Sequence, residues 1–471
     1  MEYSYQFDEE LQQEWEWTER YATQPEILRY LNHVADRFEL RADILFNTRV
    51  SEVIYEEDGG FWKVSTEGGE CFKAGYCIMA TGCLSAPNEP KFDGLDLFKG
   101  ATYRTSQWPH EGVDFTGLKV DVVGTGSSGI QAIPQIAKQA KHLHVFQRRP
   151  AYTVPARNKP LDPDHVLAIK SNYKTFRKEN YEMPFGVRVQ PSEKYAMAVD
   201  EEKRKEVYEA AWKVGGLPFP GAFQDIMENV DSNNTAGDFI RSKIEEIVHD
   251  PDQAKLLSPD TIVFCRRLCV DTDYYATFNR DNVDLVDLSG NPIEKITEGS
   301  MVVGGKEYEL DAIVFALGFD AMTGALLRID IRGRDGRTLK DKWANGPLTY
   351  LGLAIEGFPN FFTITGPGSP SVLSNMVPAI EQHVEWIAHC IAYMRNEKVR
   401  TIEANIKAEE SWVNHVNQVA DKTLFPTCNS WYTGANVPGK PRVFMPYIGF
   451  PLYLRKCNKV AANGYEGFDL R

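Results

Sequence analysis

The 471-residue sequence predicts an α/β protein in which two parallel-sheet domains are interleaved along the chain, with a helical insertion. A glycine-rich turn at 124–129 stands between an apolar strand and a helix, and segments of strand and helix character alternate on both sides of it. Two further strands end in the turns Ala80-Thr81-Gly82 and Ala316-Leu317-Gly318. Such turns are typical of chains that cross between two nucleotide-binding domains, although the second has Leu where Thr is expected.

The first 82 residues change from helical to strand patterning. Residues 1–45 carry apolar side chains at i, i+3 and i+4 spacing, and Pro25 suits the first turn of a helix. The region from 44 to 82 then reads as a run of short strands separated by Gly-Gly turns. We expect these strands at 44–46, 49–55, 61–66 and 76–80.

The glycine-rich turn consists of Gly124, Thr125, Gly126, Ser127, Ser128 and Gly129. The apolar run 120–123 precedes it, residues 130–139 read as a helix, and 143–146 read as a second strand. Strand, tight glycine turn, helix N-terminus and strand in this order form the phosphate-binding start of a Rossmann βαβ unit. The sequence therefore predicts that a dinucleotide binds at this turn.

Residues 156–255 differ in character from the segments on either side. They are charged and helical, and glycines and a proline at 215–218 interrupt them, so we expect a helical insertion here. A Gly/Pro/Ser-rich stretch follows much later, at 358–376. Around these segments we expect strands at 282–287 and 311–317, a helix at 379–395 and an aromatic tail with little periodicity at 425–471.

The composition narrows the range of partners. The chain is 43% hydrophobic and 25% charged, with a formal net charge of −14, which argues against nucleic acid or an anionic membrane as partner. No apolar run approaches the roughly 20 residues of a membrane span, and no signal-peptide pattern is present, so we expect a cytoplasmic protein. We expect no metal site, because the cysteines lack paired CxxC spacing. The oligomeric state is left open.

The residues that end the second strand predict which dinucleotide binds. In an NAD site an acidic residue at this place binds the ribose 2′-hydroxyl. Here Arg148 and Arg149 stand instead, about 20 residues past the glycines. Guanidinium groups bind a phosphate bidentately, so the sequence predicts NADP(H). The alternative is a solvated pair of arginines on a surface loop.

Several motifs resemble those of one enzyme family. Residues 98–109, FKGATYRTSQWP, resemble the FxGxxxHxxxW(P) fingerprint of the Baeyer–Villiger monooxygenases, which belong to the flavin-containing monooxygenase superfamily. Residues 124–131 look like the TGSSGIQ segment of that family. Further similarity lies at 147–150, 266–280, 319–324, 366–371 and 430–440. The resemblance covers essentially the whole chain and is closest to the phenylacetone monooxygenase-type branch.

The resemblance implies an enzyme that uses NADPH to reduce FAD and then inserts one oxygen atom of O₂ into a small-molecule ketone, giving an ester or a lactone. It implies a C4a-peroxyflavin stabilised by Arg267, whose permanent charge suits the peroxide anion and the adduct that follows. A structural ion pair is the alternative role for this arginine. By motif position the resemblance adds further cofactor-binding residues, for several of which core packing is the alternative: Ile130, Gln131, Arg266, Trp431, Tyr3, Val50 and Met376.

The resemblance also divides the chain into domains. Residues 1–115 are expected to be the remnant of an FAD domain, and 351–471 its C-terminal part. Residues 116–155 and 256–350 are expected to form the two parts of an NADP domain, on either side of the insertion at 156–255.

Three departures from the family pattern leave alternatives open. Met1 matches an internal family segment, so the first FAD-binding βαβ unit is expected to be missing; Arg104 takes the place of the fingerprint His, and Arg266 that of a Lys. One alternative is an N- or S-oxygenating flavin monooxygenase. The other is a catalytically incompetent remnant that binds NADP(H) but no flavin, because a parallel sheet that lacks central strands exposes apolar faces.

Overall fold

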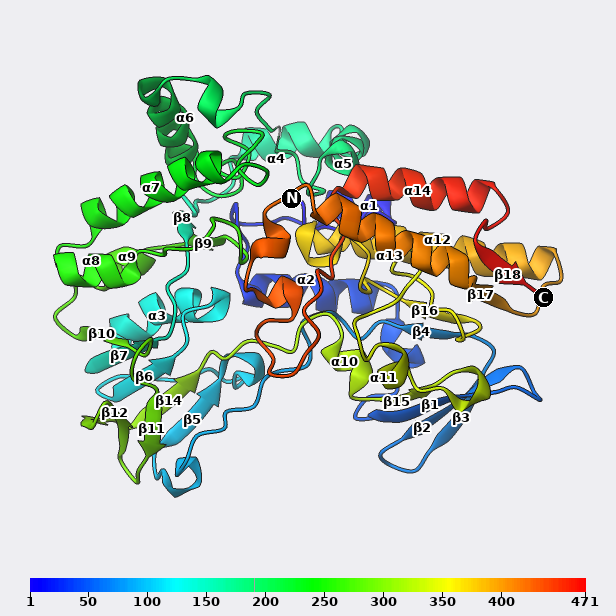
Figure 1. The fold of residues 1–471 in the computed structure, drawn as a ribbon, viewed down its shortest axis with the longest axis horizontal. Coiled ribbons are helices and arrows are strands. Elements are labelled where there is room, and N and C mark those ends of the chain that lie inside the picture. The colour runs from blue at the N-terminus through cyan, green and yellow to red at the C-terminus, as the bar shows by residue number, and fades with distance from the viewer. Residues whose placement is uncertain (190) are drawn as a thin grey trace. The chain divides into compact units, whose positions relative to one another are not determined.

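The computed structural model describes residues 1–189 and 191–471 (Figure 1). The chain divides into two compact units. Unit 1 comprises Met1–Ala86, Asn158–Gln190 and Asp320–Arg471, and unit 2 comprises Pro87–Arg157 and Pro191–Phe319. Each unit is therefore assembled from separate stretches of sequence, as interleaved domains require.

Unit 2 is built on a five-stranded parallel sheet in the order β10-β7-β6-β14-β5. The register places Phe315, at the end of β14, level with Val123 on β6 and with Arg104 on β5. The carboxyl ends of these strands therefore meet at one edge of the sheet. The strands are β5 (Ala101–Arg104), β6 (Lys119–Val123), β7 (His142–Gln147), β10 (Val283–Asp287) and β14 (Ala312–Phe315).

The two faces of this sheet are covered differently, because side chains alternate along each strand. On one face Val122 and Val145 pack in a core with Ile133 of helix α3 (Ser127–Gln139). On the other face Phe146 and Phe315 pack against a three-stranded antiparallel sheet. That second sheet consists of β11 (Ile293–Ile296), β12 (Ser300–Val303) and β13 (Lys306–Glu309).

The predicted helical insertion is helical, but it is shared between the units. The helices α4 (Pro163–Lys170) and α5 (Tyr173–Glu182) belong to unit 1. The other elements of this region and of its surroundings belong to unit 2, where side chains of α7 pack in the same apolar core as those of α3. They are β8 (Thr153–Pro155), α6 (Glu201–Val214), α7 (Val230–Ile247), α8 (Pro251–Leu257), β9 (Cys269–Asp271) and α9 (Tyr274–Thr277).

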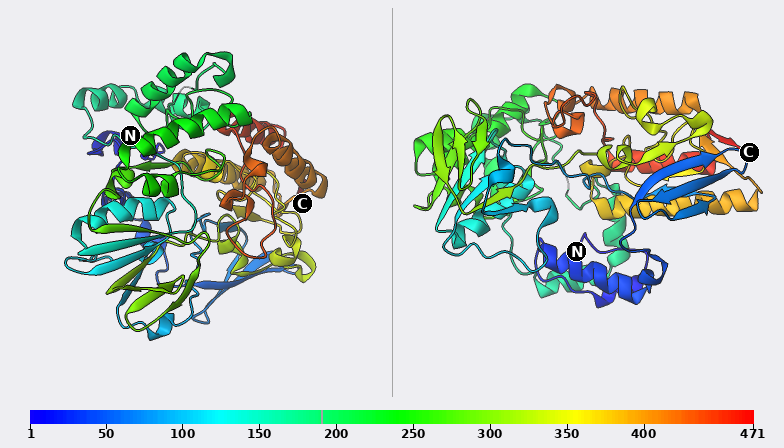
Figure 2. Two further views of the ribbon diagram at one scale, coloured as in Figure 1. Left: turned by 60° about the vertical axis from the view of Figure 1, so that its left-hand side comes forward. Right: turned by 90° about the horizontal axis from the view of Figure 1, so that it is seen from below.

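Unit 1 contains a meander of antiparallel strands and a bundle of long helices. The helices α4 and α5 pack beside the N-terminal segment through an apolar cluster that includes Leu11, Tyr30 and Phe176 (Figure 2). Strand β4 pairs in parallel with β16, so that Met79 lies opposite Thr363. The strands are β1 (Val50–Glu56), β2 (Phe61–Thr66), β3 (Cys71–Ala74), β4 (Cys77–Met79), β15 (Asp330–Arg332), β16 (Phe361–Thr363), β17 (Ile402–Ala404) and β18 (Phe468–Leu470). The helices are α1 (Glu9–Glu14), α2 (Gln24–Arg37), α10 (Gly324–Leu327), α11 (Leu339–Lys342), α12 (Met376–Asn396), α13 (Ile406–Ala420) and α14 (Phe450–Ala462).

Two expectations about secondary structure are wrong. The segment 44–46 is not a strand: its three side chains are exposed, and Asn47 follows with φ of 55°, which turns the backbone out of an extended course. The C-terminal tail is not aperiodic either, because it contains helix α14. Its buried residues Tyr453, Cys457 and Val460 do follow helical spacing, which the aromatic and glycine content of the tail had obscured.

The chain crosses between the units close to the two glycine turns expected to mark the crossings. The backbone N–H of Asp320 donates to the carbonyl of Ala86 at 2.8 Å, and that of Asn88 donates to Gly318 at 3.0 Å. The units change at 86/87, 157/158, 190/191 and 319/320, and the domain boundaries expected from the sequence are 115/116, 155/156, 255/256 and 350/351. The first difference arises because β5 joins the sheet of unit 2. In the described part of the chain, no helix has both the length and the apolar content that crossing a membrane requires.

Candidate functional site

The glycine-rich turn connects β6 to α3 at the carboxyl edge of the unit 2 sheet. Gly124 has φ of 109°, and a Cβ on it would lie 2.5 Å from the carbonyl oxygen of Ala316. A Cβ on Gly129 would lie 2.2 Å from the carbonyl oxygen of Gly124. Gly126, by contrast, has open space where a Cβ would be. Two glycines thus close the turn tightly against strand and helix, and the middle one leaves room for a ligand to approach the backbone.

Helix α3 begins at Ser127, directly after this turn. Its N-cap is Gly126, so no side chain caps the first amide groups of the helix. Those N–H groups and the positive end of the helix dipole suit a bound phosphate. Ile130, one of the predicted cofactor-binding residues, has its side chain buried in the core, and the Gln131 side chain donates to the carbonyl of Ser127 at 2.9 Å.

Arginine side chains gather beside the turn. Arg148 and Arg149 are exposed and follow β7 directly, and the Thr125 hydroxyl donates to the carbonyl of Arg149 at 3.2 Å. Arg266 lies next to them, with Nη1 3.5 Å from the carbonyl oxygen of Pro150. Burial, and then the positive charges of Arg149 and Arg148, lower the pKa of Arg266. Three guanidinium groups that repel one another form a site that an anionic group would stabilise.

Arg267 is exposed and lies two residues before strand β9. The Cys269 sulfur lies 3.2 Å from the Ser127 hydroxyl oxygen and 3.5 Å from the carbonyl oxygen of Arg267. Burial raises the pKa of the Cys269 thiol, and the charge of Arg267 acts on it in the opposite sense. Arg267 is therefore held near the start of α3, and Cys269, which the sequence analysis did not single out, supplies the connection.

The remaining candidate residues lie on separate elements of unit 1. Tyr3 is partly exposed and contacts the Trp17 ring edge-on, and Val50 is the first residue of β1. Met376 is the first residue of α12. Trp431 begins a short 3₁₀ helix, with its ring 4.2 Å from that of Tyr432. The twelve other candidates all lie in unit 2, so they and these four lie in different units.

The parallel pair of β4 and β16 provides the part of unit 1 that fits a nucleotide cofactor. Ligands of α/β sheets bind beyond the carboxyl ends of such strands. Both strands lead into glycine turns there: Gly82 has φ of 74°, and a Cβ on Gly366 would lie 2.4 Å from the Thr363 hydroxyl oxygen. In the sequence of unit 1, however, no GxGxxG turn joins a strand to a helix. The ends of β4 and β16 thus fit one part of a dinucleotide site, without the glycine turn that would bind the phosphates.

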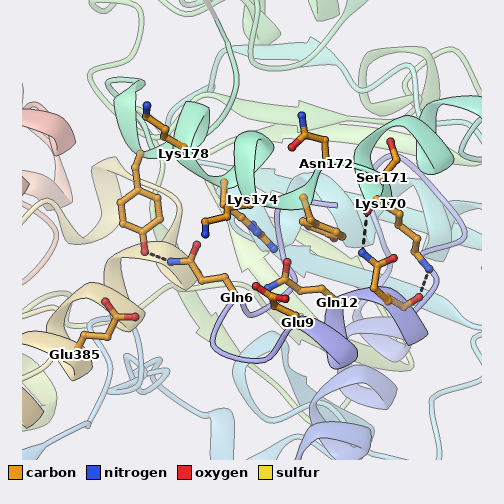
Figure 3. A pocket seen from close by; sticks show the side chains of 13 residues that line it. Gln6, Glu9, Gln12, Lys170, Ser171, Asn172, Lys174, Lys178 and Glu385 are labelled. Atoms are coloured by element: carbon orange, nitrogen blue, oxygen red, sulfur yellow. Dashed lines mark hydrogen bonds between the residues drawn. The ribbon is translucent and has the colours of Figure 1, made fainter.

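Unit 1 also contains a polar cavity of about 710 Å³ between the N-terminal segment and the helices α4 and α5 (Figure 3). Gln6 donates to the Tyr181 hydroxyl there, and the Lys170 ammonium donates to the carbonyl of Gln13 at 2.6 Å. None of the candidate residues lines this cavity. No local sequence pattern predicts this cavity, because it forms between segments that are far apart in the chain; Gln13 and Lys170, for example, are 157 residues apart.

His383, on the long helix α12, has a structural role. Its Nδ1 accepts a hydrogen bond from the backbone N–H of Thr365 at 2.9 Å, and its Nε2 lies 2.8 Å from the Tyr453 hydroxyl oxygen. Complete burial lowers the pKa of His383 to about 3, so the ring is neutral. Its side chain is fully buried within unit 1.

Comparisons with known proteins agree on one family. A family model described as pyridine nucleotide-disulphide oxidoreductase matches residues 5–228. A Baeyer–Villiger monooxygenase from Pseudooceanicola batsensis is 43% identical over 98% of this chain and 85% of its own length. The phenazine N-monooxygenase PhzNO1 from Lysobacter antibioticus is 39% identical over 99% of this chain and 86% of its own.

A solved structure gives the same result for the fold. An oxidised steroid monooxygenase bound to NADP superimposes with a TM-score of 0.95 at 50% identity, and the match covers 100% of this chain and 89% of that one. The predicted fold class, α/β with two interleaved Rossmann-like domains, is confirmed.

Proposed function

The chain belongs to the Baeyer–Villiger monooxygenases, and we propose that the arginine-lined turn of unit 2 is the NADPH site of such an enzyme. The enzyme depends on NADPH and FAD and inserts one oxygen atom of O₂ into a small-molecule ketone, which gives an ester or a lactone. The observation that carries the assignment is 43% identity to a Baeyer–Villiger monooxygenase along almost the whole chain, and the arginines of this chain beside the glycine turn form a cationic cluster.

The NADPH site is assembled from three features of unit 2. The backbone of 124–129 and the uncapped start of α3 would bind the pyrophosphate, because free N–H groups point from a helix N-terminus. Arg148 and Arg149 would bind the 2′-phosphate. Arg266 lies close enough to interact with the negative charge of the same phosphate. The mutual repulsion of these three groups supports the proposal, since a phosphate dianion would relieve it.

FAD is assigned to unit 1, at the carboxyl edge of β4 and β16. When bound, it accepts a hydride from NADPH and activates O₂. Tyr3, Val50 and Met376 are proposed to contact it, by their positions in the family motifs. Their partial exposure supports this proposal, because none of the three is sealed within the core.

Arg267 is proposed as the catalytic residue. Its guanidinium is exposed rather than buried, and it is always charged, so it can stabilise negative charge that develops on oxygen atoms during the reaction. Trp431 is proposed to hold the nicotinamide nucleotide through its indole N–H. Its ring is partly exposed beside Tyr432, which supports this role over simple core packing.

The test measures both oxygen transfer and its selectivity. Purified protein, FAD and NADPH are incubated under ¹⁸O₂ with linear and cyclic ketones, and the products are analysed by mass spectrometry. We expect an ester or a lactone that carries one ¹⁸O atom. Oxygenation of amines or sulfides with no ester would contradict the assignment of the substrate.

A second candidate activity is N-oxygenation. The similarity to a phenazine N-monooxygenase, at 39% identity, favours including aromatic amines and N-heterocycles in the same assay. A location in the cytoplasm remains a proposal, supported by the need for NADPH and tested by fractionation of cells that express the chain.

A further inference from the structure

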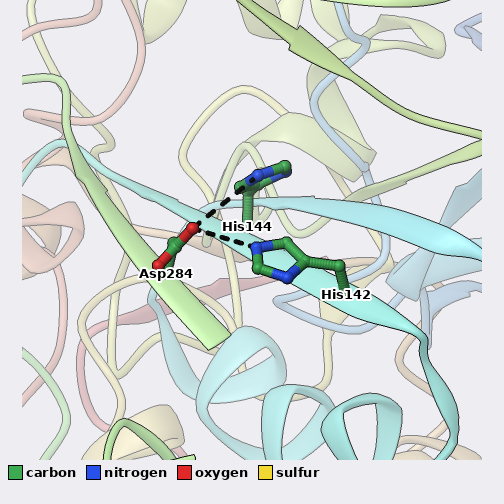
Figure 4. Close-up of side chains that lie close together, drawn as sticks. All are labelled: His142, His144 and Asp284. Atoms are coloured by element: carbon green, nitrogen blue, oxygen red, sulfur yellow. Dashed lines mark hydrogen bonds and ion pairs between the residues drawn. The ribbon is translucent and has the colours of Figure 1, made fainter. Parts of the chain in front are cut away.

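Two histidines and an aspartate lie close together on the unit 2 sheet, outside the proposed nucleotide site (Figure 4). His142 and His144 come from β7, and Asp284 comes from the neighbouring strand β10. The Nε2 atom of His142 lies 2.9 Å from Oδ2 of Asp284, and the Nε2 atom of His144 lies 4.0 Å from the same oxygen. One ligand atom from each residue falls within 4.8 Å of the other two.

The register of the parallel strands produces this cluster. His144 lies directly opposite Asp284 on one side and opposite Asp121 of β6 on the other. His142 is two residues earlier on β7 and therefore points to the same face of the sheet. His142 is also the first residue of its strand, whereas the glycine-rich turn follows the last residue of β6. The cluster thus lies toward the opposite end of the strands from the turn.

Asp121 fixes the orientation of His144. Its side chain is completely buried, and its Oδ1 accepts a hydrogen bond from Nδ1 of His144 at 2.8 Å. The rings of Tyr308 and Phe146 pack edge-on against the same imidazole, at 5.2 and 6.3 Å. With the proton on Nδ1, the lone pair of Nε2 is directed toward the carboxylate of Asp284, and a cation between these two acceptors would relieve their repulsion.

We propose that His142, His144 and Asp284 bind a divalent transition-metal ion such as Zn²⁺. Two imidazole nitrogens and one carboxylate oxygen form a common ligand set for Zn²⁺, and a carboxylate behind a ligating histidine, here Asp121, is the usual outer support of such sites. Ligand bonds of about 2.0–2.2 Å in a tetrahedral site place ligand atoms about 3.3 Å apart. The separations of 2.9 and 4.0 Å lie on either side of that value.

The cluster is accessible to ions from solvent, and its ligand atoms favour some metal ions over others. The side chains of His142 and Asp284 are 30% and 61% exposed, so an ion can enter from solvent and both side chains can adjust to it. A fourth ligand position would be open to water. Mg²⁺ and Ca²⁺ prefer oxygen ligands only, so we expect neither to compete at equal concentration.

The bound ion would join β10, an edge strand of the sheet, to β7. A ligand that binds only the folded state raises its stability, so we expect Zn²⁺ to raise the melting temperature of the protein. This role is structural and independent of the proposed oxygenation chemistry.

The experiment uses the full chain after treatment with a chelator. Zn²⁺ binding is measured by competition with a chromophoric chelator, in wild type and in the variants His142→Ala and Asp284→Asn, both at partly exposed positions that tolerate substitution. We expect one site in the wild type and at least a tenfold weaker affinity in each variant. Asp121→Asn, which keeps the shape of the outer carboxylate, is expected to weaken binding about 10- to 100-fold.

His33→Ala is the matched control. His33 is a surface histidine with its Nε2 2.6 Å from a carboxylate oxygen of Glu14, a single histidine–carboxylate pair, and its removal is expected to leave Zn²⁺ affinity unchanged. The NADP⁺ affinity of His142→Ala should also equal that of the wild type. The same Zn²⁺ affinity in wild type, His142→Ala and Asp284→Asn would overturn the proposal, as would the absence of a Zn²⁺ site in the wild type.

Discussion

At the scale of single residues, the charge state of a few side chains decides both binding and stability. Burial, and then repulsion by the neighbouring Arg149 and Arg148, lower the pKa of Arg266 beside the glycine turn. Glu381 shows the effect of burial on a carboxyl group: its Oε1 accepts a hydrogen bond from the backbone N–H of Gln6 at 2.6 Å, yet burial raises its pKa to about 7. The first group bears on the affinity for NADPH, and the second on how the stability of the protein depends on pH.

Replacement of Arg149 by Ala is expected to weaken NADPH binding and to leave NADH binding almost unchanged, because only NADPH carries the 2′-phosphate. A hydrogen bond to a charged group contributes about 1.5–3 kcal/mol, so the dissociation constant for NADPH should rise about 10- to 150-fold. Titrations with both nucleotides measure the difference. Arg395→Ala, at an exposed position on α12, is the control, and an equal loss for NADPH and NADH would refute the role of Arg149.

The Glu381→Gln variant is expected to change how stability depends on pH. The pKa of Glu381 is about 7 in the folded state and about 4.5 in the unfolded chain, so its stabilising contribution is complete below pH 4.5 and is lost as the pH rises through 7. Above pH 7 the loss amounts to about 3 kcal/mol. Urea unfolding from pH 5 to 8 should therefore show a smaller decline for the variant, and parallel curves would contradict the assignment.

At the scale of elements, close contacts and buried pairs hold the strands and helices in register. The glycine turn brings α3 against β6 and β14, because Gly124 and Gly129 leave no room for a Cβ. In unit 1, Lys342 of α11 lies 2.8 Å from Glu409 of α13, with both side chains only 2% exposed. Burial raises the pKa of Glu409, and the hydrogen bond and charge of Lys342 act against this shift.

The glycines of the turn are expected to respond differently to alanine. Gly129→Ala should destabilise the protein, since its Cβ would meet a backbone oxygen at 2.2 Å that cannot move freely. Gly126→Ala should fold like the wild type, because its Cβ has open space, but should bind NADPH more weakly by obstructing the approach of the phosphates. Thermal unfolding and NADPH titration of the two variants test this, and equal melting temperatures would contradict it.

Removal of one partner of the buried pair is expected to be costly. Lys342→Ala leaves the Glu409 carboxylate without its closest cation and should lower the free energy of unfolding by about 3–5 kcal/mol. Lys340→Ala, at an exposed position of the same helix, should change it by less than about 1 kcal/mol. Denaturant unfolding of the two variants measures the difference. A Lys342→Ala variant as stable as Lys340→Ala would argue against the pair.

At the scale of the whole molecule, two units share one chain, and two of its four crossings between them lie near Gly82 and Gly318. The glycine turn and the arginines assigned to NADPH lie in unit 2. Trp431, which is also assigned to that nucleotide, and the residues assigned to FAD lie in unit 1. The fit to FAD rests on the parallel pair β4 and β16, since unit 1 has no GxGxxG turn between a strand and a helix in its sequence. Binding of the flavin is therefore a property to be measured on the intact chain.

The visible absorption spectrum of the purified chain with added FAD tests this binding. Members of this family use FAD, so we expect the spectrum of bound oxidised flavin, bleached by NADPH in the absence of oxygen. The Arg149→Ala variant should retain the bound flavin but be bleached only at higher NADPH concentration. A chain that binds NADPH and no flavin would instead support the alternative of a nucleotide-binding remnant.

The sequence alone determined the family, the fold class and the preference for NADP(H). These depend on short-range order: a strand, a glycine turn and a helix in sequence, followed by Arg148 and Arg149 where the second strand ends. The helix α14 escaped prediction because its apolar residues are spread among aromatic and polar ones and show their helical spacing only once burial is known.

Which distant residues meet depends on the tertiary fold. Arg266 and Arg267 come to the glycine turn because β9 pairs with β8 and Cys269 contacts Ser127, 142 residues away in the sequence. Asp121, His144 and Asp284 form one row because three parallel strands adopt a particular register. Local patterns fix strands and turns, whereas register and strand order are set by packing over the whole sheet, which no short stretch of sequence contains.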